Sequence, residues 1–305
     1  MKKTILVTGV AGFIGSNIAK KLIKERYHVI GIDDLSSGNL SSVPKEVDFI
    51  RQDLSKKKNL KSLFKKCEII MHLAGQSSGE ISFENPQKDL EKNTIATLNL
   101  IEQAIETRVK KIIYASSMSV YGNYNSKIKE TMKLNPMSCY GAGKIASENY
   151  LKIFSKKLPY VIFRMFNVYG LGQDLNNLKQ GMVSIYLSQA IKNNKIIVKG
   201  SNKRKRDFIH IDDVVEIWFR SIINKKILNQ TFNLGTGKAT SVKEIINLIK
   251  IYFPDCQTKY KNQTPGDQFY VCSDNSSLKE KFKFKKFIPL KIGLNRLVKQ
   301  IIPFE

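Results

Sequence analysis

The sequence predicts an α/β fold in which a doubly wound parallel sheet carries a smaller, interwoven C-terminal lobe. Two observations predict it: strand-like and helix-like patterns alternate over the first half of the chain, and a glycine-rich turn joins the first strand to the first helix. Strands are expected at residues 4–7, 28–32, 48–53, 68–74, 111–116 and 160–165, and helices at 14–22, 60–64, 85–106 and 136–155. Ligands of such sheets bind beyond the carboxyl ends of the strands.

The first of those ends carries the glycine-rich turn. Gly9, Gly12 and Gly15 follow the strand at regular spacing and open the helix, so the backbone can approach a phosphate that the helix N-terminus attracts. The next strand ends at Asp33 and Asp34, where a carboxylate can accept hydrogen bonds from a ribose and repel a 2′-phosphate. The pattern predicts a dinucleotide site for NAD rather than NADP. The alternative, a βαβ unit without a ligand, leaves the glycine spacing and the acidic strand end unexplained.

The second half of the chain has a different texture. Helices are expected at 182–192, 213–223, 242–252 and 290–301, strands at 196–200 and 231–235, a basic hairpin at 201–206 and a turn at 264–267. Ser241 and Glu244 have the spacing of a capping box. We therefore divide the chain into a dinucleotide-binding domain over 1–170 and a mainly substrate-binding lobe over 171–305, of which some strands and helices return to the sheet.

Composition limits the compartment and the partners. The chain has 305 residues and a formal net charge of +25, but only eight of its 51 basic residues are Arg and the lysines are spread along the chain. Diffuse lysine indicates a solvated surface that attracts anionic substrates rather than a nucleic-acid site. No apolar run approaches the roughly 20 residues of a membrane helix. The four cysteines form no Cys-x-x-Cys pair and no cluster suggests a metal, so we expect a reduced, cytoplasmic protein without membrane or nucleic-acid contacts.

A tyrosine and a lysine provide the first candidate for catalysis. Tyr140 and Lys144 are four residues apart and share one helix face, where the ammonium would favour the phenolate and let the tyrosine act as a base toward a sugar hydroxyl. Ser116 and Ser117 end the preceding strand and could share the proton. Taken alone, an incidental pair on an amphipathic helix and a hydroxyl in a turn explain these residues as well.

With these residues the chain resembles the extended short-chain dehydrogenase/reductase superfamily. It is most similar to the NAD-dependent nucleotide-sugar epimerase/dehydratase family, with motifs closest to its UDP-glucose 4-epimerase-like members. The resemblance covers nearly the whole chain and rests on the motifs at 8–15, 33–38, 53–54, 72–75, 116–122, 140–144, 164–170, 206–213 and 265–267. It implies a Rossmann-type sheet with NAD as cofactor and a nucleotide sugar as substrate.

The resemblance also assigns roles to residues. The catalytic residues are Ser117, Tyr140 and Lys144. The cofactor-binding residues are Gly9, Gly12, Phe13, Ile14, Gly15, Asp33, Asp34, Ser37, Gly38, Asp53, Leu54, Leu73, Ala74, Gly75, Tyr140 and Lys144. The substrate-binding residues are Ser117, Asn167, Arg206, Asp267 and Val271. A homodimer that pairs the helices near 88–106 and 139–155 is also implied, although their apolar stripes fit helices that cover the sheet equally well.

The chemistry that the resemblance implies is 4-epimerisation through a transient 4-keto sugar, in a pathway to surface polysaccharide. Tyr140 takes the proton of the sugar 4-hydroxyl, hydride passes from C4 to NAD⁺ and returns on the other face, and Lys144 keeps Tyr140 acidic. A 4,6-dehydratase carries an acidic pair after the catalytic hydroxyl, where this chain has Met118 and Ser119. A 4-keto reductase is a further alternative, as is a non-catalytic NAD-binding protein with a basic surface for RNA or a partner.

Other positions bear on the substrate or invite a catalytic role. Thr264 stands where some relatives have a second phosphate-binding Arg, so the phosphate clamp is lighter or a Lys substitutes. Val271 replaces a bulky Tyr near the sugar C2 group, which leaves room for an N-acetylhexosamine as well as a hexose. His72 and His210 lie in apolar runs and are expected to be structural, and Trp218 is expected in the core.

Overall fold

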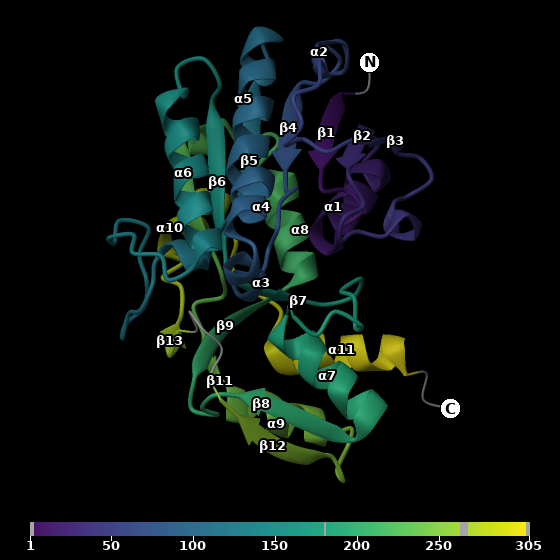
Figure 1. Ribbon diagram of the computed structural model, residues 1–305, viewed down its shortest axis with the longest axis vertical. Coiled ribbons are helices and arrows are strands. Elements are labelled where there is room, and N and C mark those ends of the chain that lie inside the picture. Colours follow the sequence, from purple (N-terminus) through teal and green to yellow (C-terminus); the bar gives the residue numbers. More distant parts are fainter. Residues whose placement is uncertain (1–2, 180, 263–267, 303–305) are drawn as a thin grey trace.

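The computed structural model describes residues 3–179, 181–262 and 268–302. In this part of the chain, seven parallel strands form the main sheet in the order β3-β2-β1-β4-β5-β6-β10 (Figure 1). The strands are β1 (Thr4–Thr8), β2 (His28–Asp33), β3 (Asp48–Arg51), β4 (Ile69–His72), β5 (Lys111–Ser117), β6 (Tyr160–Met165) and β10 (Gln230–Leu234). This order is that of a Rossmann fold with one additional strand, and it reverses between β1 and β4, where such sheets bind ligands.

Helices cover both faces of this sheet because its strands alternate apolar side chains to either side. Ile5 and Val7 of β1 join one cluster with α1, α8 and α10, whereas Leu6 joins the other with α2, α5 and α6. The helices are α1 (Phe13–Lys24), α2 (Lys61–Phe64), α5 (Ala96–Glu106), α6 (Cys139–Ile153), α8 (Ile211–Arg220) and α10 (Ser276–Phe282). The predicted doubly wound sheet is confirmed.

The helix expected at 85–106 is not continuous. It consists of α4 (Pro86–Leu90), a π-helical turn at Glu91–Ile95, and α5, and a short α3 (Gly79–Glu84) precedes it. Such π turns inside α-helices are rare and frequently accompany functional sites. This one turns Lys92 and Asn93 out of the ordinary helical register.

The smaller lobe lies below the carboxyl ends of the main strands (Figure 1). Its elements are α7 (Met182–Asn193), α9 (Val242–Lys250), α11 (Leu290–Ile301) and the strands β7 (Asn167–Tyr169), β8 (Lys195–Lys199), β9 (Lys205–His210), β11 (Ala239–Ser241), β12 (Gln257–Lys261) and β13 (Tyr270–Val271). The capping box of Ser241 and Glu244 opens α9 as predicted. The turn expected at 264–267 lies outside the described residues.

The expected basic hairpin at 201–206 is wrong. β8 pairs in parallel with β12, and β9 pairs with β7, β11 and β13. The basic run is only partly exposed. Lys203 and Lys205 face the solvent, whereas Arg204 and Arg206 are buried and donate to backbone oxygens such as those of Ser201 and Lys205. A run of like charges in the sequence predicts a turn at the surface, but the two guanidinium groups here donate hydrogen bonds to backbone carbonyls of the loop.

Segments from the second half complete the first. β10 pairs with β6, and Trp218 of α8 and Phe282 of α10 lie with ring centroids 5.4 and 5.8 Å from that of Phe163. Trp218 is fully buried, as expected. None of the helices in the described ranges combines the length and the apolar character that crossing a membrane requires.

Candidate active site

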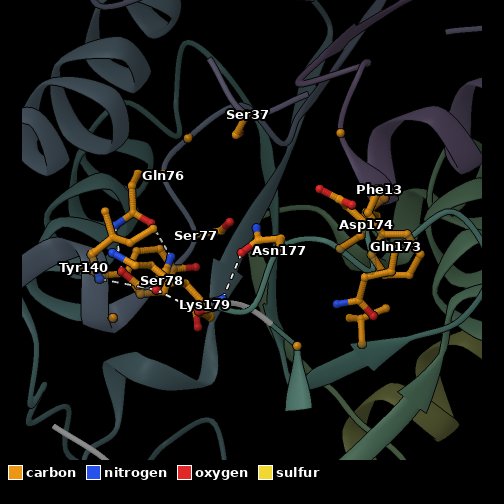
Figure 2. A pocket seen from close by; sticks show the side chains of 18 of the residues that line it. Phe13, Ser37, Gln76, Ser77, Ser78, Tyr140, Gln173, Asp174, Asn177 and Lys179 are labelled. Atoms are coloured by element: carbon orange, nitrogen blue, oxygen red, sulfur yellow. Dashed lines mark hydrogen bonds between the residues drawn. The ribbon is translucent and has the colours of Figure 1, made fainter. Parts of the chain in front are cut away.

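A cavity of about 1300 Å³ runs along the carboxyl ends of the main strands and into the smaller lobe. Sites for a single small ligand usually measure about 300–1,000 Å³, so this cavity has room for a cofactor and a substrate together. Figure 2 shows Tyr140, Gln76 and Ser78 at one side and Phe13, Gln173 and Asp174 at the other.

The glycine turn forms one wall of the cavity. Gly9 has φ of +71°, and a Cβ there would lie 2.7 Å from the Ala74 nitrogen. A Cβ on Gly15 would lie 2.1 Å from the Gly9 oxygen, so the turn and the helix touch through bare backbone. In the described residues no side chain caps the N-terminus of α1. Its first N–H groups therefore remain for a phosphate, and the wall fits the diphosphate of a dinucleotide.

Replacing Gly15 with Ala is expected to weaken NAD binding by about tenfold or more, because the methyl group would push the turn away from α1. Titration of the wild type and the variant with NAD, after removal of any bound nucleotide, measures the effect. Gly79→Ala is the matched control, since a Cβ at Gly79 would lie 3.6 Å from its nearest neighbour, Ser138 Oγ. Equal loss of NAD affinity in both variants would contradict the role of the close approach.

Asp33 joins the glycine turn to the second strand. Its carboxylate is buried and accepts hydrogen bonds from the backbone nitrogens of Ala11 (3.0 Å) and Leu35 (2.9 Å). Burial raises the pKa of Asp33, and these two hydrogen bonds oppose the shift. A rigid carboxylate next to the turn is well placed to accept ribose hydroxyls and to exclude a 2′-phosphate.

Tyr140, Lys144 and Ser117 come together where β5 meets α6. The Ser138 side chain caps α6 by accepting from the Gly141 nitrogen at 3.1 Å. Lys144 Nζ donates to the Ala115 oxygen at 3.0 Å and lies 5.7 Å from the centroid of the Tyr140 ring. All three functional side chains are buried and line the cavity.

The expected acidity of Tyr140 is not what the protein environment provides. Burial raises the pKa of Tyr140 to about 12, and the hydrogen bond with Ser117 only partly opposes it. Burial likewise lowers the pKa of Lys144 to about 8, against the carboxylates of Asp89 and Glu148. The effect of burial on the pKa of Tyr140 is larger than any effect of a lysine four residues away. Formation of a phenolate therefore needs a further positive charge in the cavity.

Replacing Lys144 with Met is expected to raise the free energy of unfolding at pH 7, by at most about 3 kcal/mol, because a buried ammonium disappears. Between pH 8 and 10 the unfolded wild type binds the lysine proton that the folded state has lost. Wild-type stability should therefore rise with pH in this window relative to the variant. Urea unfolding at several pH values measures it. Lys152→Met, on the same helix, is the control, and equal slopes for wild type and Lys144→Met would contradict the prediction.

The substrate residues predicted by resemblance are only partly brought together. Asn167 Nδ2 donates to the backbone oxygen of Asp207 at 3.1 Å, and both Asn167 and Arg206 line the cavity. Burial and the neighbouring Arg204 lower the pKa of Arg206 to about 10. Asp267 and Thr264 lie outside the described residues.

Val271 is not where the resemblance implied. It is fully buried in a cluster with Val120, Tyr121 and Phe166 and does not line the cavity. Gln268, which precedes β13, lines the cavity instead. We therefore correct the assignment of Val271 as a gate beside the sugar.

The other predicted site residues meet at one cavity. Those that line it are Gly9, Gly12, Phe13, Ile14, Gly15, Asp33, Asp34, Ser37, Gly38, Asp53, Leu54, Leu73, Ala74, Gly75, Ser117, Tyr140, Lys144, Asn167 and Arg206. His72 is structural as expected. It is fully buried, bonds the hydroxyls of Thr8 (2.7 Å) and Thr97 (2.9 Å), and its pKa is lowered to about 3 by burial.

Residues that the sequence reasoning missed also line the cavity. Asp89 is buried and accepts from Gln76 Nε2 at 2.8 Å and from Asn93 Nδ2 at 3.0 Å. Lys92 lies nearby on the π turn. These side chains lie on a helix whose sequence has the pattern of an amphipathic helix that packs on the sheet. Only the polar residues on one of its turns could have indicated that it also lines a site.

Residues 170–179, which follow β7, cross from one wall of the cavity to the other. Asn17 Nδ2 of α1 donates to the Leu171 oxygen at 3.2 Å, and Ser78 Oγ donates to the Lys179 oxygen at 3.2 Å. Lys179 also forms an ion pair with Glu84 of α3 at 2.7 Å. Figure 2 shows Asn177 and Lys179 between the two sides.

Comparison with known proteins identifies the family. The model of the family described as "NAD dependent epimerase/dehydratase family" matches residues 5–235. The chain belongs to this NAD-dependent epimerase/dehydratase family. The matched range contains the glycine turn and the cavity wall with Tyr140 and Lys144.

Relatives within the epimerase/dehydratase family match over nearly their whole length. UDP-glucose 4-epimerase of Mycolicibacterium smegmatis is 33% identical over 96% of both chains. The structure of UDP-glucose 4-epimerase from Thermotoga maritima with UDP-glucose has a TM-score of 0.92 at 33% identity, covering 98% of both chains. UDP-N-acetylglucosamine 4-epimerase from Methanobrevibacter ruminantium, in complex with UDP-N-acetylmuramic acid, has a TM-score of 0.92 at 31% identity, covering 99% of both chains.

Proposed function

We propose that this protein is an NAD-dependent nucleotide-sugar 4-epimerase that acts on a UDP-hexose or a UDP-N-acetylhexosamine through a transient 4-keto sugar. The observation that carries the proposal is the meeting of Ser117, Tyr140 and Lys144 with the glycine turn in one cavity that extends to Arg206. The epimerases to which the chain is similar act on nucleotide sugars of these two kinds.

The residues proposed to hold NAD fit its parts. The uncapped N-terminus of α1 and the close approach of Gly9 and Gly15 suit the diphosphate, and Asp33 suits the adenosine ribose. Lys144 would hold the nicotinamide ribose. Bound NAD supplies a reversible hydride acceptor and a positive charge beside the reacting sugar.

The chain's own residues would move and hold a proton. Tyr140 accepts the proton of the sugar 4-hydroxyl on its phenolic oxygen and returns it after the keto sugar has turned over. The Ser117 hydroxyl shares that hydrogen bond, and the Lys144 ammonium stabilises the phenolate by charge. Because the pKa of Tyr140 is about 12 within the protein alone, we propose that the cationic nicotinamide contributes to its ionisation.

Met118 and Ser119 favour epimerisation over dehydration. These residues follow Ser117 in a short turn, Met118–Val120, that lines the cavity with a thioether and a hydroxyl. Elimination of water from C5 and C6 needs an acid and a base near those atoms, and neither side chain serves as either.

Release of the bound cofactor tests the proposal. The purified protein is denatured and the released nucleotide is identified, then native protein is incubated with UDP-glucose and with UDP-N-acetylglucosamine. About one NAD per chain together with a C4 epimer supports the proposal. A product without its 6-hydroxyl would indicate a dehydratase, and net consumption of NAD(P)H a reductase. A salt-dependent RNA shift without any effect of nucleotide sugars would favour the non-catalytic alternative.

We further propose a cytoplasmic homodimer that works in polysaccharide biosynthesis, with residues 1–170 binding NAD and residues 171–305 mainly the substrate. Exposed apolar side chains on α4, the π turn and α6, namely Leu90, Ile95 and Ile153, support pairing of these helices. The free cysteines are consistent with a reducing compartment. Sedimentation of the wild type and of Ile153→Glu measures the oligomeric state.

A further inference from the structure

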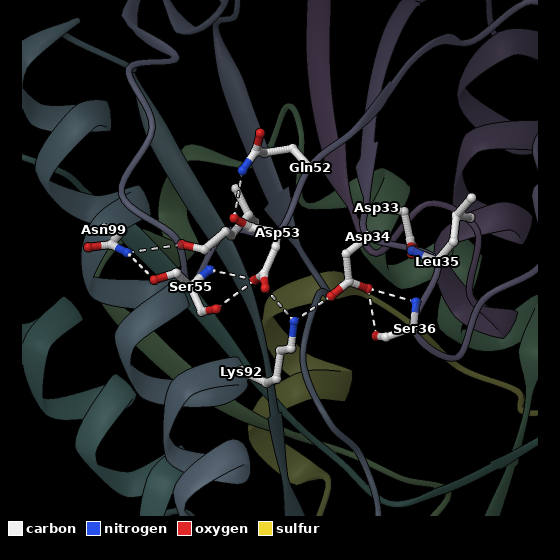
Figure 3. A network of polar contacts seen from close by, with 10 residues as sticks. Asp33, Asp34, Leu35, Ser36, Gln52, Asp53, Ser55, Lys92 and Asn99 are labelled. Carbon is white, nitrogen blue, oxygen red and sulfur yellow. Dashed lines mark hydrogen bonds and ion pairs between the residues drawn. The ribbon is translucent and has the colours of Figure 1, made fainter.

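Lys92 links two carboxylates at the edge of the cavity (Figure 3). Its Nζ lies 2.6 Å from Asp34 Oδ2 and 2.8 Å from Asp53 Oδ2, and all three side chains are at least two-thirds buried. Asp34 follows β2 and Asp53 follows β3, so one ammonium joins the ends of two neighbouring strands.

The remaining oxygen of each carboxylate is held by a serine two residues later. Asp34 Oδ1 accepts from the Ser36 nitrogen and hydroxyl at 2.9 and 2.6 Å, and Asp53 Oδ1 accepts from those of Ser55 at 2.9 and 2.6 Å. Burial alone would raise the pKa of both carboxyls, but the bonds from Lys92 and the serines lower it. Both groups therefore stay ionised and oriented.

The helix that carries Lys92 holds this edge at a second point. Asn99 of α5 donates through Nδ2 to the backbone oxygens of Leu54 (3.0 Å) and Ser55 (3.2 Å) (Figure 3). Lys92 itself reaches the carboxylates from the π turn. The irregular turn thus coincides with the point where the helix must approach two acidic strand ends.

We propose that Lys92 is the positioning residue for the adenosine end of the dinucleotide site. Without the ammonium, Asp34 and Asp53 would repel each other across one short gap and turn away, which disorders the edge that receives the adenosine. This inference rests on the proposed binding of NAD. Its effect is confined to the adenosine end, because Lys144 and Tyr140 lie on another helix.

Calorimetric titration of protein freed of bound nucleotide with ADP-ribose, which carries the adenosine end without nicotinamide, tests the proposal. Lys92→Met should bind ADP-ribose and NAD about tenfold more weakly than the wild type and should bind UDP as the wild type does. Lys61→Met is the matched control. It removes an ion pair of 2.6 Å with Glu106 that lies about half exposed, and should leave all three affinities unchanged.

Charge and packing are separated by Lys92→Arg. If the cation is what positions the carboxylates, the arginine variant should bind ADP-ribose within about threefold of the wild type. The inference is overturned if Lys92→Met binds ADP-ribose as tightly as the wild type, if it weakens UDP to the same extent, or if Lys92→Arg is as weak as Lys92→Met. A wild type that has been freed of bound nucleotide and then binds neither ADP-ribose nor NAD would instead refute the proposed function itself.

Discussion

Replacing Tyr140 with Phe is expected to lower kcat about 10³-fold while the protein keeps its bound NAD. The change removes only the phenolic hydroxyl and keeps the aromatic ring. Tyr140 is buried beside Ser117 in the cavity. Without the phenolic oxygen no group in the proposed set can take the proton of the sugar 4-hydroxyl. Epimer formation followed by NMR measures the rate, and release of nucleotide on denaturation measures the bound NAD.

Tyr124→Phe is the matched control. This tyrosine also loses a hydroxyl that is hydrogen-bonded, to the Lys133 oxygen at 2.7 Å, but it does not line the cavity. Its kcat should stay within about twofold of the wild type, which is less than 0.5 kcal/mol of activation free energy. If Tyr140→Phe retains a tenth or more of the wild-type rate, Tyr140 is not the base and the proposed mechanism fails.

Replacing Arg164 with Met is expected to lower the free energy of unfolding by about 3–5 kcal/mol. Arg164 Nε and Nη2 donate to the two carboxylate oxygens of Glu148 at 2.9 and 2.6 Å, and both residues are buried. The variant leaves the carboxylate of Glu148 buried without its bidentate partner. Urea unfolding at pH 7 measures the loss.

The double variant Arg164→Met/Glu148→Met distinguishes loss of the ion pair from the penalty of leaving one charge buried without its partner. It removes both charges and should recover most of the lost stability. Lys110→Met is the control, since its ion pair with Glu68 at 2.9 Å is exposed and its loss should cost less than about 0.5 kcal/mol. A loss below about 1 kcal/mol in Arg164→Met would contradict the prediction.

The pH dependence of this pair has a definite sign. Arg164 and Ser116 hold the pKa of Glu148 below its ordinary value of 4.5, although burial acts in the opposite direction. The folded state therefore keeps this carboxylate ionised where the unfolded chain has bound a proton. The stability from this group is present above pH 4.5 and is lost as the pH falls through the lower folded value.

Local patterns in the sequence were sufficient to predict most of the sheet and to bring the glycine turn and the acidic end of β2 to one cavity. The glycine turn, the acidic end of β2 and the capping box depend on neighbours along the chain, so short-range rules describe them. The return of later segments to the sheet was also predicted, and β10 beside β6 confirms it.

Features that depend on three-dimensional packing could not be predicted. The pKa of Tyr140 follows from burial rather than from the position of Lys144, and burial is not visible in a four-residue spacing. Val271 is buried by Val120, Tyr121 and Phe166, which come from distant parts of the chain. Lys92 lies on a π turn, and a helical pattern of 3.6 residues per turn gives no sign of one.

The completion of the sheet by late segments also governs how the protein can be made. When only residues 1–170 have left the ribosome, β6 is an unpaired edge strand of the nascent sheet. Phe163 then lacks its packing contacts with the rings of Trp218, Phe232 and Phe282. Open strand edges beside apolar surface promote aggregation. We therefore expect the nascent first half to wait for residues near 282, and a fragment cut after residue 170 to precipitate rather than fold as an independent cofactor-binding module.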